Sequence, residues 1–212
     1  MPRVRRQRRE RHGAGRDGHR RFGPGRPRRQ GRDRHRLRGD RRRAGVPGAQ
    51  GSAGDIGHIY VQPADGRTVL CRCGNENCLE AIAGGGALLR DATAAGLPVS
   101  STRDVVELAA QGDGPALELV RDAGRTIGTV LAALVNFFNP HRIVMTGGVA
   151  QAGAPLLAGI REAVYRRSMP LAARALEITV SDAPDLSGRV GAALMAIEEY
   201  LDEDSVVDAL AR

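Results

Sequence analysis

The residues best suited to chemistry in this chain gather between positions 51 and 80. All three cysteines lie there, and His58 precedes them. Thiolates and imidazole are the ligands that zinc prefers, and three cysteines with one histidine form a standard structural set. A Cys-x-Cys step lets two sulfur atoms reach one ion from a tight turn, which the following glycine favours. The spacing therefore predicts a zinc knuckle with the ligands His58, Cys71, Cys73 and Cys78.

Two other roles for these cysteines are less well supported. A disulfide framework is disfavoured, because the sequence shows no secretory signal and the number of cysteines is odd. The thiols could also be buried and inert. Their clustering within eight residues, between positions 71 and 78, argues against that interpretation.

The elements that must position these ligands follow from the apolar pattern. The pattern predicts an α/β fold in which strands alternate with helices on the faces of a βαβ-type sheet. Strands are predicted over 59–61, 142–149 (buried) and 176–180, and helices over 79–95 (broken at glycines 84–86), 101–109, 116–138, 155–165 and 188–201. Glycines 147 and 148 end the second strand, where α/β sheets commonly bind ligands.

The stretch from Gly51 to Glu80 resembles the signature of the ROK family (repressors, open reading frames, kinases), which comprises sugar kinases and sugar-sensing transcriptional repressors. The family pattern Gly-x-x-Gly-Glu-x-Gly-His, then Cys-x-Cys-Gly-x-x-Gly-Cys-x-Glu, is matched by GSAGDIGH and CRCGNENCLE. Two positions differ, because Asp55 replaces the usual glutamate and Asn77 the usual glycine. The resemblance implies part of an actin-like ATPase (ribonuclease H-like) fold with a zinc knuckle.

The same resemblance implies which residues bind ligands. Asp55, His58 and Glu80 would bind the hydroxyl groups of a sugar. His58 would use one ring nitrogen for zinc and turn the other toward the sugar. Aspartate is one methylene shorter than glutamate, so its bond to the sugar would be weaker or mediated by water. Gly147 and Gly148 correspond to the adenosine motif of the fold, which its repressor members retain without catalysis.

The charge of the chain is very uneven. Residues 1–43 hold 19 arginines and 4 acidic residues (net +15), while the other 169 residues hold 13 and 20 (net −7), so the whole chain carries +8. The basic segment has too few apolar side chains to offset its ordering entropy, so it is expected to be disordered. A nucleic-acid-binding arm is one interpretation. The lack of lysine and of interleaved aromatic residues argues against it.

We favour a different interpretation, in which this segment is translated out of frame. Shifted by one base, the codons of residues 7–16 permit NDANVMALGE and those of residues 32–43 permit GTGIGCGVIADG. These strings resemble the ROK catalytic segment and phosphate loop, in the family's order. We therefore expect an Arg-rich leader over 1–47, a ROK C-terminal lobe with the zinc site over 48–202, and an acidic and apolar tail over 203–212.

The predicted function is that of a fragment of a sugar-responsive ROK transcriptional regulator, which binds a sugar effector beside a structural zinc ion. The segment 164–172 looks closer to ROK regulators than to ROK kinases. DNA would be bound through an upstream module outside this chain, and the intact protein would form a homo-oligomer. No apolar run is long enough to span a bilayer, so a cytoplasmic location is expected.

The alternative is a glucokinase-like ROK sugar kinase that phosphorylates a hexose with ATP. Such a kinase needs a general base and a glycine-rich phosphate loop. Neither is present in the chain as translated, so no catalytic residue is assigned. The strands that would neighbour this lobe are missing too, which should leave sheet edges and apolar faces exposed.

Overall fold

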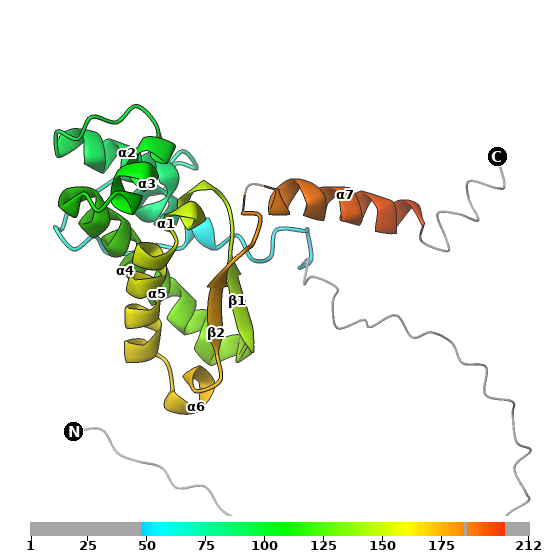
Figure 1. The fold of residues 1–212 in the computed structure, drawn as a ribbon. Helices are drawn as coiled ribbons and strands as arrows, with labels where there is room; N and C mark the ends of the chain where they lie inside the picture. The colour runs from blue at the N-terminus through cyan, green and yellow to red at the C-terminus, as the bar shows by residue number, and fades with distance from the viewer. Residues whose placement is uncertain (1–47, 185, 202–212) are drawn as a thin grey trace, which may run out of the picture. The chain divides into compact units, whose positions relative to one another are not determined.

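The structure, a computed structural model, describes residues 48–184 and 186–201, apart from the side chain of Glu199. These residues belong to a compact unit that starts at Val46. The expected leader over 1–47 and tail over 203–212 lie outside the described residues, so their assignments stay predictions. Figure 1 shows the arrangement of the helices and strands.

Most of the described chain is helical. The helices are α1 (Leu79–Ala83), α2 (Gly85–Ala94), α3 (Thr102–Ala110), α4 (Gly114–Phe138), α5 (Ala154–Arg167), α6 (Pro170–Ala173) and α7 (Ser187–Tyr200). Two 3-10 helices, η2 (Ile56–His58) and η3 (Gly148–Ala152), and two strands, β1 (Arg142–Met145) and β2 (Glu177–Val180), complete it. All five predicted helices are confirmed, and the break in the first falls at Gly84 alone.

The packing of α5 against α4 forms the centre of the fold (Figure 1). Three glycines permit this contact, because a side chain at any of them would overlap the backbone of the other helix. A Cβ atom built at Gly124 would lie 2.5 Å from the carbonyl oxygen of Leu156, and one built at Gly128 would lie 2.6 Å from that of Ile160. A Cβ atom built at Gly159 would overlap the Arg121 carbonyl. The two helices therefore approach each other along their backbones.

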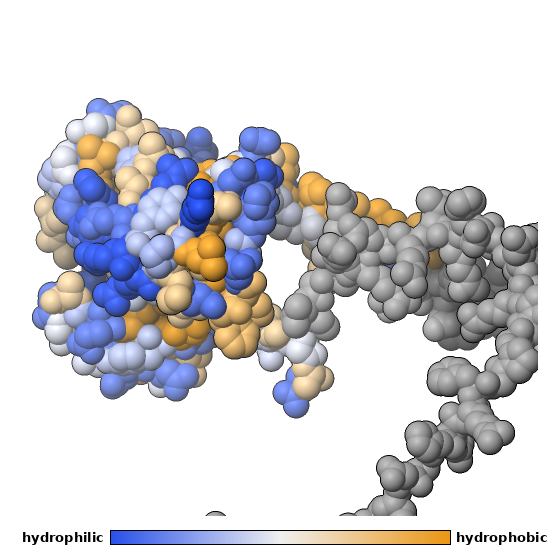
Figure 2. Space-filling model, turned by 90° about the horizontal axis from the view of Figure 1, so that it is seen from below, coloured by the Kyte–Doolittle hydropathy of each residue, from blue (hydrophilic) through white to orange (hydrophobic). Residues whose placement is uncertain are grey.

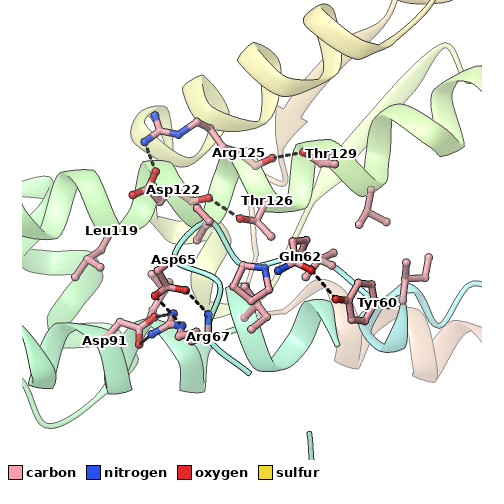
Figure 3. Close-up of a pocket in the computed structure, with 18 of the residues that line it drawn as sticks. Tyr60, Gln62, Asp65, Arg67, Asp91, Leu119, Asp122, Arg125, Thr126 and Thr129 are labelled. Atoms are coloured by element: carbon pink, nitrogen blue, oxygen red, sulfur yellow. Dashed lines mark hydrogen bonds and ion pairs between the residues drawn. The ribbon is translucent and has the colours of Figure 1, made fainter. Parts of the chain in front are cut away.

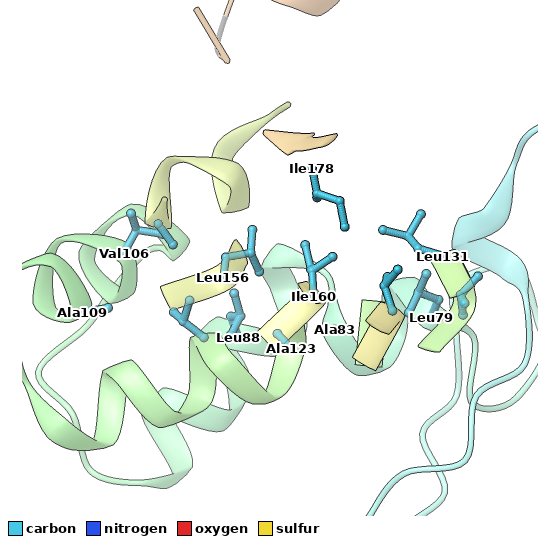
Figure 4. Packing of buried hydrophobic residues seen from close by; sticks show 14 of the residues in the cluster. Leu79, Ala83, Leu88, Val106, Ala109, Ala123, Leu131, Leu156, Ile160 and Ile178 are labelled. Carbon is cyan, nitrogen blue, oxygen red and sulfur yellow. The ribbon is translucent and has the colours of Figure 1, made fainter. Parts of the chain in front are cut away.

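The strands flank α5 and form a βαβ unit. β1 and β2 pair in parallel from Arg142 beside Glu177 to Met145 beside Val180, as the alternating pattern predicts. Ile178 of β2 points toward the helices in Figure 4 and is buried. The prediction that the first of these strands is buried is wrong, because β1 alternates between exposed and half-buried residues. Among the described residues it has one neighbouring strand, so its other edge stays open.

The strand predicted over 59–61 is also wrong. This segment forms one isolated antiparallel bridge, between Tyr60 and Cys78, instead of a strand. A turn follows it, in which the Gly66 amide donates to the Pro63 carbonyl over 3.1 Å with a φ of 70° at Gly66. The prediction of an extended backbone is correct at Ile59. Its pairing does not continue beyond one bridge, because Cys78 stands between the left-handed Asn77 and the first residue of α1.

Local hydrogen bonds fix the ends of the longer helices. Ser101 and Asp104 form a capping box at the start of α3, in which each side chain accepts from the other's backbone amide. The Asp113 side chain accepts from the Ala116 amide at the start of α4. Asn139 ends α4 in a left-handed conformation, which asparagine tolerates better than most residues.

The buried side chains form one cluster, to which the helices from α1 through α5 and the strand β2 all contribute (Figure 4). The apolar stripe of α7 is not part of it, because Val190, Leu194 and Ile197 are about half exposed. At the end of α4 and in α6, Phe137 and Leu171 are 79% and 84% exposed. Orange patches therefore interrupt the hydrophilic surface in Figure 2, which agrees with the expectation of exposed apolar faces.

Within the described residues, no helix is both long enough and apolar enough to cross a membrane.

The glycine contact predicts a large difference between two Gly→Ala substitutions. Gly128→Ala forces a methyl group against the backbone of α5 and should lower the free energy of unfolding by about 1–3 kcal/mol. Gly86→Ala, in α2, meets no atom within 4 Å and should leave stability equal or raise it by up to about 1 kcal/mol. Urea unfolding of both variants measures the difference, and equal effects would contradict the packing described.

Candidate functional site

Three passes of the chain, near residues 60, 70 and 77, build the part of the molecule that holds the cysteines. An antiparallel bridge joins Tyr60 to Cys78, and another joins Leu70 to Glu76. The turn of residues 71–74 closes with a hydrogen bond of 3.0 Å from its last amide to its first carbonyl, and its last residue is a glycine with a φ of 91°. This turn presents the first two cysteines to the third.

The predicted zinc ligands come together here. One ligand atom each from His58, Cys71, Cys73 and Cys78 lies within 4.8 Å of all the others. The Cys73 and Cys78 sulfur atoms are 3.6 Å apart, and His58 Nδ1 lies 3.7 Å from Cys71 Sγ. Zn–S bonds of about 2.3 Å and Zn–N bonds of about 2.0 Å in a tetrahedron separate such atoms by about 3.5–3.8 Å. The donor set and its spacing fit a tetrahedral zinc ion.

The thiols differ in their surroundings. All three cysteines are free of disulfides; Cys71 and Cys78 are buried, and Cys73 is exposed. A backbone hydrogen bond from Asn75 lowers the pKa of Cys73 to about 7. Burial raises the pKa of Cys78 to about 12, and the neighbouring thiols add to this shift. A cation among these sulfur atoms would favour their charged forms, as ligands of a metal require.

The residues predicted to bind a sugar lie beside the cysteine cluster. Asp55 precedes η2, and its Oδ2 is 3.8 Å from His58 Nε2, the ring nitrogen that faces away from the sulfur atoms. Glu80 lies in the first turn of α1. A Cβ atom built at Gly57 would be 3.5 Å from Asp55 Oδ1 and 3.7 Å from Glu80 Cβ, so the two acidic side chains flank this glycine. Both acidic residues are exposed.

Asp55 and His58 lie at a distance that one hydroxyl group could bridge from the side. The 3.8 Å between their polar atoms is too long for a direct hydrogen bond. If Nδ1 of His58 binds a metal, Nε2 carries the proton and can donate it. A hydroxyl group between the two could accept from His58 and donate to Asp55.

The predicted nucleotide-binding glycines lie elsewhere in the fold. Gly147 follows β1 with a φ of 89°, and its amide donates to the Pro184 carbonyl over 3.1 Å. Gly148 starts η3 and lines a small hollow of about 230 Å³ with α3 residues Thr102 and Val106. The glycines therefore follow a parallel strand that ends at Met145, earlier than the predicted range of 142–149. The hollow beside them is lined by none of the four predicted zinc ligands.

A larger groove, of about 990 Å³, was not foreseen from the sequence. Residues 59–67, α2 and α4 line it, as Figure 3 shows, but Asp55, His58 and Glu80 do not. Most of its labelled polar groups bond to one another in Figure 3, including Tyr60 to Gln62 and Arg125 to Asp122. The first residue that lines the groove, Ile59, directly follows His58 in the chain. Most charged side chains of the groove are already paired with each other and are therefore less available to a ligand.

One ion-pair network at this groove connects the segment of residues 59–67 to α2. Arg67 donates to both carboxylate oxygens of Asp91, over 2.9 and 2.6 Å, and Arg90 donates to the same carboxylate. Burial alone would raise the pKa of Asp91, but the hydrogen bonds from Arg67 and Arg90 outweigh it and hold this pKa below its ordinary value. The sequence offered no signal for this pairing, because the partners are 24 residues apart.

Comparison with known proteins identifies the family. The model of the ROK family matches residues 44–199, about three quarters of the chain, so this chain belongs to the ROK family. It is 33% identical over 131 residues to the DNA-binding transcriptional dual regulator NagC of Escherichia coli K12, covering 58% of this chain and 32% of NagC. It is also 32% identical over 158 residues to a glucokinase of Halalkalibacterium halodurans, covering 68% of this chain and 47% of that enzyme.

The solved structures agree with this assignment. The ROK hexokinase of Thermus thermophilus matches with a TM-score of 0.57 and 38% identity, over 71% of this chain and 49% of the hexokinase. The chain thus spans about a third to a half of the length of these relatives. Both regulators and sugar kinases of the family are therefore similar to it.

Removal of the charge on Asp91 tests the ion-pair network that Asp91 forms with Arg67 and Arg90. Because its folded pKa is depressed, Asp91 stabilises the protein above the pH at which it titrates when unfolded, and this contribution is lost as the pH falls through the folded pKa. Asp91→Asn should therefore lower the free energy of unfolding by about 1 kcal/mol at pH 7. The difference from wild type should shrink in acid. Asp65→Asn, at a more exposed partner of Arg67, is the control and should change less.

Proposed function

We propose that this chain is the sugar-binding lobe of a ROK transcriptional regulator, in which a zinc ion supports the site of a sugar effector. The observation that carries the proposal is the position of His58 between two groups of side chains. One of its nitrogens faces the cysteine cluster, and the other faces Asp55. A single imidazole can therefore belong to a metal site and to a sugar site.

Zinc would be held by His58, Cys71, Cys73 and Cys78. Bound there, it would supply a structural crosslink between chain segments that otherwise share few hydrogen bonds. With Nδ1 of His58 engaged, the ring is held in one tautomer with the proton on Nε2. Cys78 directly precedes α1, so the same crosslink would also fix the first turn of that helix, which carries Glu80.

A sugar would be recognised by the acidic side chains around Gly57. The Asp55 and Glu80 carboxylates accept hydrogen bonds from hydroxyl groups, and these bonds are stronger than bonds between neutral groups. His58 would donate from Nε2, which lies 3.8 Å from Asp55 Oδ2. The aspartate at position 55 leaves more room than a glutamate would, which favours a ligand group or an ordered water at that position.

The regulator assignment rests on the similarity to NagC, which is 33% identical over 131 residues. DNA contact and assembly into a homo-oligomer would depend on parts of such a protein outside this lobe. A ROK sugar kinase that uses ATP is the second candidate, favoured by the 38% identity to a hexokinase. Under that candidate Gly147 and Gly148 would approach the nucleotide, and no general base for the transfer is assigned among the described residues.

Metal content tests the first part of the proposal. The purified chain should hold about one zinc ion, as measured by inductively coupled plasma mass spectrometry, and chelation should lower its melting temperature. His58→Ala and Cys78→Ser should lose the metal, because each removes a ligand of the four. His141→Ala changes an exposed histidine elsewhere and should keep it. A wild-type chain that neither holds nor takes up zinc would refute this part.

Sugar binding tests the second part. N-acetylglucosamine, glucose and xylose, which the names of similar proteins mention, form the first panel for isothermal titration calorimetry. One of them should bind, and Asp55→Asn or Glu80→Gln should weaken it at least about tenfold, since each removes a charge-assisted hydrogen bond worth about 1.5–3 kcal/mol. Asp65→Asn and Glu107→Gln are matched controls. ATP-dependent phosphorylation of the bound sugar would favour the kinase instead.

A further inference from the structure

Asn77, which lies beside the cysteine cluster, has a backbone conformation that is unusual for a residue other than glycine. Its φ is 54°, and among the described residues only one other non-glycine residue, Asn139, has a positive φ. Asparagine tolerates this left-handed conformation better than most residues. Asn77 is nevertheless 5% exposed, so its polar side chain is buried as well. A buried side chain on a left-handed backbone calls for a specific set of partners.

These partners belong to all three passes of the chain. The Asn77 amide donates to the Val69 carbonyl, and the Val69 amide donates back to Asn77 Oδ1, both over 2.8 Å. The Asn77 carbonyl accepts from the Val61 amide, also over 2.8 Å. One residue thus joins the segment near 61, the segment near 69 and its own.

Each of these segments carries a donor of the cysteine cluster. Cys78 follows Asn77 directly, Cys71 lies two residues after Val69, and His58 lies three residues before Val61. A glycine, the residue usual in the family signature, would permit the same backbone conformation. It would offer no side-chain acceptor to Val69, however, and the half-buried Val69 amide would lose this partner.

We infer that Asn77 is a positioning residue for the metal site: it sets the spacing of Cys71, Cys78 and His58 before a metal binds. This inference rests on the proposed zinc site and concerns how the chain prepares it. Preorganised ligands bind a metal more tightly, because less ordering remains to be done on binding. Asn77 touches no metal and acts through the backbone of its neighbours.

Cobalt(II) binding to the full chain tests the inference, because its absorption spectrum reports tetrahedral thiolate ligation directly. Competition with a chelator gives the dissociation constants of the wild type, Asn77→Gly and Asn77→Ala. Asn77→Ala loses both the favoured conformation and the Val69 bond, so it should weaken cobalt binding about tenfold or more. Asn77→Gly keeps the conformation and should fall between that variant and the wild type.

Asn139 supplies the matched control. It has the same residue type and a φ of 45°, but it caps α4 far along the chain from the donors. Asn139→Ala should lower the melting temperature yet leave cobalt affinity and spectrum unchanged. All titrations run below the lowest melting temperature in the set, and Asn77→Gly carries the test if Asn77→Ala does not fold.

The outcomes separate the inference from the proposal beneath it. Failure of the wild type to bind cobalt or zinc would refute the metal site itself. Wild-type binding with unchanged affinity in both Asn77 variants would overturn the positioning role alone. Equal loss of affinity in the Asn77 and Asn139 variants would also overturn it, because general stability would then explain both.

Discussion

The close approach of α4 and α5 is the contact on which the rest of the structure depends. Gly124, Gly128 and Gly159 let the two backbones meet where any side chain would keep them apart. α4 then serves as the surface for the shorter helices α1, α2 and α3, while α5 packs against β2. Because α1 carries Glu80 and begins at Cys78, the candidate site is held in place by this helical pair.

The site itself is built by other means. No ladder of strands holds the segments that carry His58 and the cysteines; two isolated bridges and a few single hydrogen bonds do so. Such a segment buries little apolar surface and would open easily without further links. The bonds of Asn77 join different passes of this loop, and the pairing of Arg67 with Asp91 joins the loop to α2. A metal at the proposed site would add a third link. Their effects on the loop should therefore reinforce one another.

The sequence predicted the elements whose signals are long and local. A helix over 116–138 repeats its apolar face through many turns, and a pair such as Ser101 with Asp104 is a cap whatever surrounds it. The cysteine spacing likewise indicated one cluster. Burial of β1 was predicted wrongly, since the pattern shows that a strand is apolar but not whether anything covers it. The prediction of a strand over 59–61 was wrong, because a strand also requires an extended partner of similar length.

Features that depend on distant partners were out of reach. Arg67 and Asp91 are ordinary surface residues in the sequence, and only the fold brings them together. The groove along α4 is lined by segments that lie far apart in the sequence and share no pattern. The sequence showed Asn77 in place of the glycine of the family signature. It did not show that the Asn77 side chain accepts a hydrogen bond that a glycine could not accept. Such a signal gains meaning once the φ angle is known.

The shared imidazole has a thermodynamic consequence for the proposed site. A metal on Nδ1 of His58 would fix the proton on Nε2, and this N–H group would donate the hydrogen bond that a sugar hydroxyl accepts. A bound sugar would in turn hold the ring in the orientation that the metal requires. Linkage makes such an effect reciprocal, so each ligand raises the affinity for the other by the same factor. A regulator built on this lobe would thus respond to its sugar most strongly when the metal is in place.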